Sequence, residues 1–425
     1  MPVACLVATL DTKGEEVRYL RDRIQAGGHD AFVIDVGILG EPPGGLKADV
    51  TSRQVAEAAG TTLEKLRAIG SRGLAVDEMI AGVKRICKDL YQNGRVHGFL
   101  AVGGAEGTVI GTQVMQMFPV GVPKLMISTM ASGSRTFGPY TGTKDILMMH
   151  SVIDILGLNK VSRIIFDTAA GAMVGMLDQL SRASEQSLAI EPLRVAMTTY
   201  GNTMGAVSVC KPLLEENGYE VVTFHANGVG GKAMEEMIEE GFFDMVLDLT
   251  THELTDLVCQ GYHNPGPDRL KAAGRKGLPQ VVAPGCIDYI VQGTRESLPA
   301  KYENRATYYM NPLMTLVRTA ANEMAEVGHL TAKRLNESTG PVVYVLPLKG
   351  FSMPNRPGGA LYDPAADEAF RAALKQNLDK KIKLIEVDAD INDEAFARTL
   401  VDSLLSLANP THPTAIPRGI RPGPS

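Results

Sequence analysis

Short apolar segments alternate with longer segments of helical periodicity along almost the entire chain. A strand is predicted at residues 3–8, then a polar turn at 11–14, a helix at 15–24 and a second strand at 31–35. Apolar runs of this length, each followed by a helix, are typical of parallel strands that helices cover on both faces. We therefore predict an α/β fold with mostly parallel sheets.

The same pattern starts again in the second half of the chain. A strand is predicted at 195–199, and the segment MTTYGNTMGA at 197–206 resembles VATLDTKGEE at 7–16. Each segment places Thr, a polar turn and Gly between a strand and a helix. A shared α/β pattern explains these few identities almost as well as a true duplication does.

The length of the chain indicates more than one domain. Its 425 residues exceed the size at which a single hydrophobic core usually keeps growing. We predict two tandem Rossmann-like domains at 1–190 and 191–408, followed by a flexible tail at 409–425. Within the second domain, a single long helix is predicted at 313–336.

Charge and composition restrict the classes of partner. The net charge is -6 and no run of Lys and Arg marks a basic face, so nucleic-acid binding is not expected. No apolar run approaches the roughly 20 residues of a membrane-spanning helix, and the first residues are too few and uncharged for a signal peptide. The five scattered cysteines predict reduced, buried thiols rather than disulfides or a zinc site. We expect a cytoplasmic homo-oligomer that binds a small molecule.

A glycine-rich loop, GGAEGT at 103–108, follows an apolar strand and opens a helix. Ligands of open parallel sheets bind beyond the carboxyl ends of the strands, where helix amino termini present free N–H groups to anions. Gly103, Gly104 and Gly107 would let the backbone approach a phosphate, and Thr108 would donate its hydroxyl group. The alternative is a glycine turn that packs a helix tightly on its sheet.

A second candidate loop is TLDTKG at 9–14. Asp11 and Thr12 can cap the following helix, and Lys13 places a cation where a phosphate would lie. Capping alone would also explain Asp11 and Thr12. We nevertheless predict that these three residues contact the cofactor.

A third candidate loop is STMASGSR at 128–135, which is rich in hydroxyl groups and small residues. Such a loop suits an anion or a ribose. Ser132 and Gly133 are therefore predicted to bind the cofactor. A polar surface loop would have the same composition.

The segment DLTTHE at 248–253 ends a predicted strand in the second domain. A carboxylate and an imidazole at such a position suit proton transfer or metal binding, so Asp248 and His252 are the candidate catalytic residues. The alternative is that Thr250 or Thr251 caps a helix and that His252 is a solvated residue of its first turn.

Four residues are candidates for substrate binding. Gly201 and Asn202 lie in a turn between a strand and a helix, whereas Lys349 and Arg356 lie in the long irregular loop PLKGFSMPNRPGG at 347–359. Loops of this length in compact domains often have a function. The two cations would suit an acidic substrate in a cleft between the domains.

The segments TLDTKGEE, GGAEGT, STMASG, TTYGNTMG and PLKGFS occur in this order along the chain. Together they resemble the UPF0261 family, which is related to the ATP-binding amino-terminal region of the tomato mosaic virus resistance protein Tm-1. The resemblance extends to about Leu407. It implies two Rossmann-like domains, ATP with Mg²⁺ as the ligand, and self-association, but it supplies no reaction.

Three functions remain open from the sequence. The first is an ATP-binding protein or an ATP-dependent enzyme that acts on a small acid or sugar. The second is an enzyme for a phosphosugar or sugar acid that uses no nucleotide. The third is a non-catalytic scaffold whose assembly depends on a ligand. The sequence does not assign a set of metal ligands to any of them.

Overall fold

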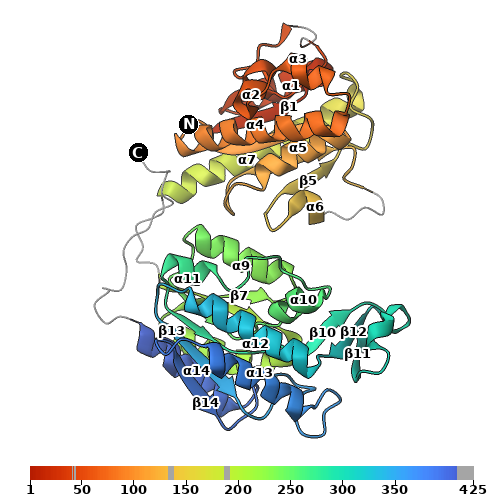
Figure 1. The fold of residues 1–425 in the computed structure, drawn as a ribbon. Coiled ribbons are helices and arrows are strands. Elements are labelled where there is room, and N and C mark those ends of the chain that lie inside the picture. Colours follow the sequence, from red (N-terminus) through yellow and green to blue (C-terminus); the bar gives the residue numbers. More distant parts are fainter. Residues whose placement is uncertain (41, 43–44, 133–137, 186–191, 409–425) are drawn as a thin grey trace. The chain divides into compact units, whose positions relative to one another are not determined.

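The computed structural model describes residues 1–408 except 41, 43–44, 133–137 and 186–191. The tail at 409–425 lies outside the described residues. The chain divides into two compact units between residues 189 and 190, which we call the N-unit and the C-unit (Figure 1). Each unit is described by itself.

The N-unit contains a parallel five-stranded sheet with the strand order β2-β1-β3-β4-β5. The chain runs from β1 outward to β2 and then returns to β3 on the other side of β1. The strand order therefore reverses between β1 and β3, and ligands of such sheets bind beyond the carboxyl ends at this point. The described elements are β1 (Val3–Ala8), α1 (Leu10–Ala26), β2 (Asp30–Asp35), α2 (Ser52–Ala59), α3 (Leu63–Ala68), α4 (Arg72–Gln92), β3 (Gly98–Gly103), α5 (Ala105–Met115), β4 (Lys124–Ser128), α6 (Gly138–Thr141), β5 (Leu147–His150) and α7 (Lys160–Glu185).

Strand β1 shows how the sequence positions the layers of the N-unit. Successive side chains of a strand point to opposite faces of the sheet. Cys5 and Val7 pack into the core beneath α2, α3, α4 and α5, whereas Leu6 and Ala8 pack into the core beneath α1 and α7. Both faces are covered, which explains why this strand is a continuous apolar run in the sequence.

The C-unit contains a parallel six-stranded sheet with the order β7-β6-β8-β9-β13-β14. Its first five strands follow the same order as those of the N-unit, so the reversal lies between β6 and β8. The predicted α/β fold with two Rossmann-like domains and mostly parallel sheets is confirmed. The described elements are β6 (Arg194–Thr199), the 3₁₀ turn η2 (Gly201–Thr203), α8 (Met204–Glu216), β7 (Glu220–His225), α9 (Val229–Glu239), β8 (Met245–Asp248), α10 (Glu253–Cys259), α11 (Ala272–Lys276), β9 (Gln280–Val282), β10 (Tyr289–Gln292), the 3₁₀ turns η3 (Arg295–Ser297) and η4 (Ala300–Tyr302), β11 (Thr307–Asn311), β12 (Met314–Arg318), α12 (Ala321–Asn336), β13 (Val342–Pro347), α13 (Pro364–Asn377), β14 (Lys383–Val387) and α14 (Glu394–Leu407).

A small antiparallel sheet of order β10-β12-β11 projects from the C-unit (Figure 1). The predicted helix at 313–336 is wrong in its first part, because β12 occupies 314–318 and α12 begins only at Ala321. An apolar run as short as 314–318 fits a strand or a helix equally well. The segment forms a strand because it pairs with β10 and β11 in the tertiary structure.

The predicted polar turn at 11–14 is also wrong, since α1 already begins at Leu10. The buried carboxylate of Asp35, at the end of β2, accepts a hydrogen bond from the backbone N–H of Leu10 at 3.0 Å. This contact satisfies one of the free N–H groups at the helix start. A kink at Lys13, with φ of -128°, lies within the turn that the sequence predicts at 11–14.

Two expectations about composition can be compared with the structure. All five cysteines are buried and free, as predicted. Among the described residues, no helix combines the length and the apolar character that crossing a membrane requires.

Candidate ligand sites at the carboxyl ends of the strands

Helix α5 begins at the point where the strand order of the N-unit reverses. Its N-cap is Gly104, and no side chain among the described residues caps its first N–H groups. A Cβ atom added to Gly104 would meet its nearest neighbour, Thr129 Oγ1, only at 3.9 Å. The backbone at the start of α5 is therefore open to a ligand, and the helix dipole favours an anion there.

The other residues of the GGAEGT loop serve the packing of α5 on the sheet. A Cβ atom on Gly103 would lie 2.8 Å from Cα of Gly107, so this close approach requires glycine. The buried Thr108 hydroxyl lies 2.7 Å from the Gly104 carbonyl oxygen and 2.6 Å from the Ser128 hydroxyl. A phosphate would have to replace one of these contacts, and phosphate binding by Gly103, Gly107 and Thr108 stays a prediction.

The residues of the β1–α1 junction hold neighbouring segments in place. Asp11 accepts a hydrogen bond from the backbone N–H of Leu39 at 2.8 Å. Lys13 donates from Nζ to the carbonyl oxygen of Ile155 at 2.6 Å, and Thr12 contacts Thr9 through its hydroxyl. Because these are contacts within the protein, cofactor binding by Asp11, Thr12 and Lys13 stays a prediction.

The loop after β4 is described only in part. Ser132 is exposed at the end of its described segment, and Gly133 lies outside the described residues. The preceding Ser128 accepts a hydrogen bond from the backbone N–H of Met130 at 2.8 Å, which shapes the start of the loop. Binding of a cofactor by Ser132 and Gly133 stays a prediction.

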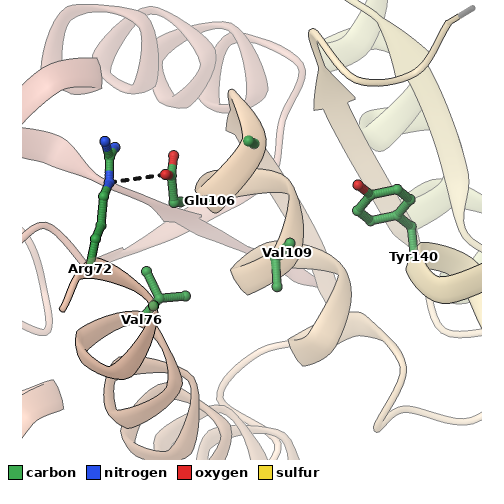
Figure 2. Close-up of a pocket in the computed structure, with 7 residues that line it drawn as sticks. Arg72, Val76, Glu106, Val109 and Tyr140 are labelled. Carbon is green, nitrogen blue, oxygen red and sulfur yellow. Dashed lines mark ion pairs between the residues drawn. The ribbon is translucent and has the colours of Figure 1, made fainter. Parts of the chain in front are cut away.

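A pocket of about 240 Å³ adjoins the first turns of α5. Figure 2 shows Arg72 and Glu106 joined by an ion pair of 2.9 Å, with Tyr140 facing α5 from a separate segment. The Arg72 and Glu106 side chains are exposed. Exposed pairs of this kind stabilise a protein by only about 0–1 kcal/mol, so Arg72 is readily available to another anion. The pocket is lined by Arg72, Gly73, Val76, Ala105, Glu106, Val109 and Tyr140.

In the C-unit, Asp248 belongs to a buried charge cluster at the end of β8. Its two carboxylate oxygens accept hydrogen bonds from the guanidinium group of Arg269 at 2.5 and 2.7 Å, and one of them also accepts the Thr198 hydroxyl at 2.8 Å. Glu253 and Glu235 contact the same guanidinium group at 2.6 and 3.3 Å. Burial raises the pKa of Glu235, against the opposing effect of Arg269. This arrangement gives Asp248 a structural role, and proton transfer by it stays a prediction.

His252 lies at the start of α10 and is completely buried, so the interpretation of a solvated first-turn residue is wrong. Its Nδ1 lies 2.9 Å from the carbonyl oxygen of Cys286. A carbonyl only accepts, so Nδ1 carries a proton and Nε2 of the neutral ring has a free lone pair. Nε2 has no hydrogen-bond partner among the described residues and lies 3.6 Å from Asp256 Oδ2. Burial alone would lower the pKa of His252, but Asp256 and the Cys286 carbonyl outweigh it and raise the pKa.

Asp256 and His263 complete the cluster around His252. The carboxylate of Asp256 is buried and accepts backbone N–H groups from Val291 at 3.0 Å and His263 at 2.8 Å. Burial and the neighbouring His252 lower the pKa of His263 to about 4, so its imidazole is neutral at neutral pH. One possible ligand atom from each of His252, Asp256 and His263 lies within 4.8 Å of the other two.

A second pocket, of about 260 Å³, has His263 in its wall and lies at the carboxyl ends of β6 and β7. The Tyr200 ring stacks on His225 with ring centroids 5.0 Å apart. Burial lowers the pKa of His225. The turn between β11 and β12 closes another side. The pocket is lined by Tyr200, Gly201, His225, Asn227, His263, Met310, Asn311 and Met314.

The four predicted substrate-binding residues occupy different places in the C-unit. Gly201 lines the pocket, whereas Asn202 is buried and donates to the hydroxyl of Tyr289 at 3.1 Å. Lys349 pairs with Asp388 at 3.0 Å, and Arg356 is exposed. The structure does not bring the two cations into the described pocket, and substrate binding by these four residues stays a prediction.

Sequence reasoning missed Asp256, His263 and Arg269. One signal was available, because His252 and Asp256 are four residues apart and such residues lie on one face of a helix. Arg269 carried no signal of its own, since its carboxylate partners come from separate elements.

Comparison with known proteins assigns the chain to a family. Residues 2–182 match the uncharacterised protein family (UPF0261) N-terminal domain, and residues 192–408 match its C-terminal domain. The chain belongs to the UPF0261 family. A UPF0261 protein of Clostridium tetani (strain Massachusetts / E88) is 38% identical over 95% of this chain and 98% of the relative.

A more distant relative is the ToMV resistance protein Tm-1(GCR237) of Solanum lycopersicum, which is 30% identical over 96% of this chain. The match covers 56% of the tomato protein, so this member of the UPF0261 family spans about half of that relative. Among solved structures, UDP-GlcNAc 2-epimerase of Methanocaldococcus jannaschii, in complex with UDP-GlcNAc and UDP, has 9% identity over 92% of this chain and 75% of that chain. Its TM-score of 0.21 is too low to support an argument.

Proposed function

We propose that this UPF0261 protein binds ATP with its N-unit, at the start of α5. The observation that carries the proposal is the open amino terminus of α5 at the reversal of the strand order, beside a pocket with a cation and an aromatic ring. The family resemblance, which implies ATP, also supports it. Backbone N–H groups of α5 would bind the phosphates, as helix amino termini do in other parallel sheets.

Three side chains of the pocket suit the remaining parts of ATP. Arg72 would exchange its exposed pair with Glu106 for a phosphate, which a guanidinium group can bind at two points. The ring of Tyr140 offers an apolar face for the base (Figure 2). Mg²⁺ usually bridges the phosphates and takes one or two carboxylates, and Glu106 is the carboxylate at this pocket.

The variant Gly104→Asp separates ligand binding from folding. The Cβ position of Gly104 is open, with its nearest neighbour at 3.9 Å, so the new side chain meets no atom at close range. The backbone at Gly104, with φ of -80° and ψ of -148°, has to shift toward the β region for aspartate to act as an N-cap residue, and circular dichroism checks that the variant folds. The added carboxylate would occupy the anion position and repel the phosphates.

Thermal unfolding with ATP, ADP and NAD, each with and without Mg²⁺, tests the proposal. ATP at 100 times its dissociation constant should stabilise the wild-type protein by about 2.7 kcal/mol, and Gly104→Asp should lose this effect. Gly171→Asp is the matched control, because Gly171 is an exposed glycine of α7 with no neighbour within 4 Å among the described residues. The proposal is wrong if ATP stabilises neither the wild-type protein nor the control, or if it stabilises Gly104→Asp equally.

A further inference from the structure

We propose that the C-unit binds one divalent transition-metal ion through Nε2 of His252, the carboxylate of Asp256 and a ring nitrogen of His263. One possible ligand atom from each of the three residues lies within 4.8 Å of the other two, and Nε2 of His252 is 3.6 Å from Oδ2 of Asp256. The site shares no residue with the ATP site of the N-unit. It can therefore be correct whether or not ATP binds.

The separation of His252 and Asp256 fits two ligands of one metal ion better than a hydrogen bond. A charge-assisted N–H···O bond between them would be about 2.7–2.9 Å long, whereas Nε2 and Oδ2 are 3.6 Å apart. Two ligands that lie about 2.0–2.2 Å from a tetrahedral metal ion are separated by roughly 3.3–3.6 Å. The two side chains are four residues apart at the start of α10, and both are completely buried. Their packing therefore holds this gap open.

The proton on His252 is also arranged as in metal sites. Ligating histidines usually donate their other ring N–H to a carbonyl or a carboxylate, which fixes the tautomer and the orientation of the ring. Nδ1 of His252 makes this contact with the Cys286 carbonyl at 2.9 Å. Cys286 itself has a φ of 60°, which costs energy for a residue with a side chain. Nε2 is left buried without a hydrogen-bond partner among the described residues, facing Asp256.

The carboxylate of Asp256 is held in place by the backbone. Its two oxygens accept N–H groups from Val291 and His263, which leaves lone pairs for a metal ion. A Cβ atom on Gly261 would lie 2.2 Å from this carboxyl group, so only glycine at that position leaves Asp256 where it is. Hydrogen bonds that hold a ligating side chain in place are typical of metal sites.

The donor set indicates the class of metal. Two imidazole nitrogens and one carboxylate oxygen suit Zn²⁺, Mn²⁺, Fe²⁺, Co²⁺ or Ni²⁺, whereas Mg²⁺ and Ca²⁺ prefer oxygen ligands. Three protein ligands leave a coordination position free, as in catalytic sites. His263 lines the 260 Å³ pocket, so that position is within reach of a small molecule held there. The metal would thus place a Lewis acid at the wall of this pocket.

Metal binding by the full chain, without an affinity tag and without nucleotide, tests the proposal. The protein is dialysed against a chelator and then equilibrated with Zn²⁺ or Co²⁺. The expected result is one ion per chain by elemental analysis and a visible absorption band from nitrogen-bound Co²⁺. Fewer than about 0.1 ion per chain at equimolar Zn²⁺ and Co²⁺ would overturn the proposal.

Two variants and one control locate the ion. His263→Gln changes the ligand at the pocket wall, and His252→Asn retains a donor for the Cys286 carbonyl. Each should weaken Zn²⁺ binding by more than the roughly 10–100-fold that follows when a ligand loses its hydrogen-bond partner. His329→Gln, an exposed histidine on α12, should bind Zn²⁺ like the wild-type protein. A folded His263→Gln variant, checked by circular dichroism, with wild-type affinity would refute the site. If neither variant folds, the Co²⁺ spectrum of the wild-type protein tests the site instead. A spectrum without the features of nitrogen-bound Co²⁺ would refute the proposed ligands.

Discussion

The variant Asp288→Asn tests whether the C-unit contains a buried carboxyl group that destabilises the folded state at neutral pH. Asp288 lies between β9 and β10 and is completely buried. Its Oδ2 accepts the Ser352 hydroxyl at 2.7 Å, whereas Oδ1 has no hydrogen-bond partner among the described residues. Burial, only partly offset by Arg318, raises the pKa of Asp288 from 3.8 to about 6.

The magnitude follows from this pKa difference. Each pKa unit corresponds to about 1.4 kcal/mol, so ionising Asp288 in the folded state costs about 3 kcal/mol relative to the unfolded chain. Below about pH 4 both states are protonated and the cost is absent. Between about pH 4 and 6 the folded state retains the proton that the unfolded state has lost, so the free energy of unfolding falls as the pH rises. Above about pH 6 the full cost applies.

Asparagine has no charge to bury, so the cost should disappear in the variant. Relative to Asp288→Asn, the wild-type protein should lose about 2 kcal/mol of stability between pH 4.5 and 7.5, the remainder lying below this range. Urea unfolding followed by circular dichroism measures the difference at each pH. The comparison removes the contribution of titrating groups that do not interact with Asp288, whereas the neighbouring Asp367 is part of the measured difference.

Asp402→Asn is the matched control. Asp402 is exposed on α14 of the same unit, and its replacement should leave the pH dependence of the wild-type protein unchanged. A difference between wild type and Asp288→Asn that varies by less than about 0.5 kcal/mol over this pH range would show that Asp288 titrates normally, and the reasoning from burial would be refuted.

Two further predictions concern the packing of each unit. Replacing Arg269 by Met leaves its three buried carboxylate partners unpaired and should lower the free energy of unfolding of the C-unit by about 3–5 kcal/mol, as measured with urea. Part of this stability should return at low pH, where the carboxylates are protonated. A decrease of less than about 1 kcal/mol would contradict the buried charge cluster. Gly82→Ala places a Cβ atom 2.0 Å from the Val55 carbonyl oxygen and should destabilise the N-unit by about 1–3 kcal/mol. In Gly171→Ala the added Cβ atom meets no atom within 4 Å among the described residues, so this variant should be more stable by up to about 1 kcal/mol. Equal urea-unfolding midpoints for the two variants would be inconsistent with this packing.

Much of the fold could be predicted from the sequence because the relevant signal is local. The strand at 3–8 has the bounds that its apolar run predicts, and the strands predicted at 31–35 and 195–199 each begin only one residue earlier in the structure. Burial on both faces makes such runs continuous, and helices between them follow the 3.6-residue period. The position of the α5 loop at the carboxyl end of a strand follows from the same order of elements.

Local pattern was insufficient where distant segments decide the conformation. The run at 314–318 is a strand because β10 and β11 pair with it, and the helix at Leu10 begins early because Asp35, 25 residues away, satisfies its first N–H group. Neither partner can be recognised from neighbouring residues. In both places, hydrogen bonds formed in the tertiary structure outweighed local preference.

From the sequence alone, the α/β class and the order of strands and helices in two successive halves could be predicted, because apolar runs and helical periodicity are local signals. The contacts of individual side chains at the strand ends could be seen only in the folded chain. Asp248 and His252 are four residues apart, yet one faces Arg269 and the other faces Asp256 and the Cys286 carbonyl. Charge pairing, hydrogen bonding and burial depend on distances between atoms from separate elements, which the periodicity of a sequence does not contain.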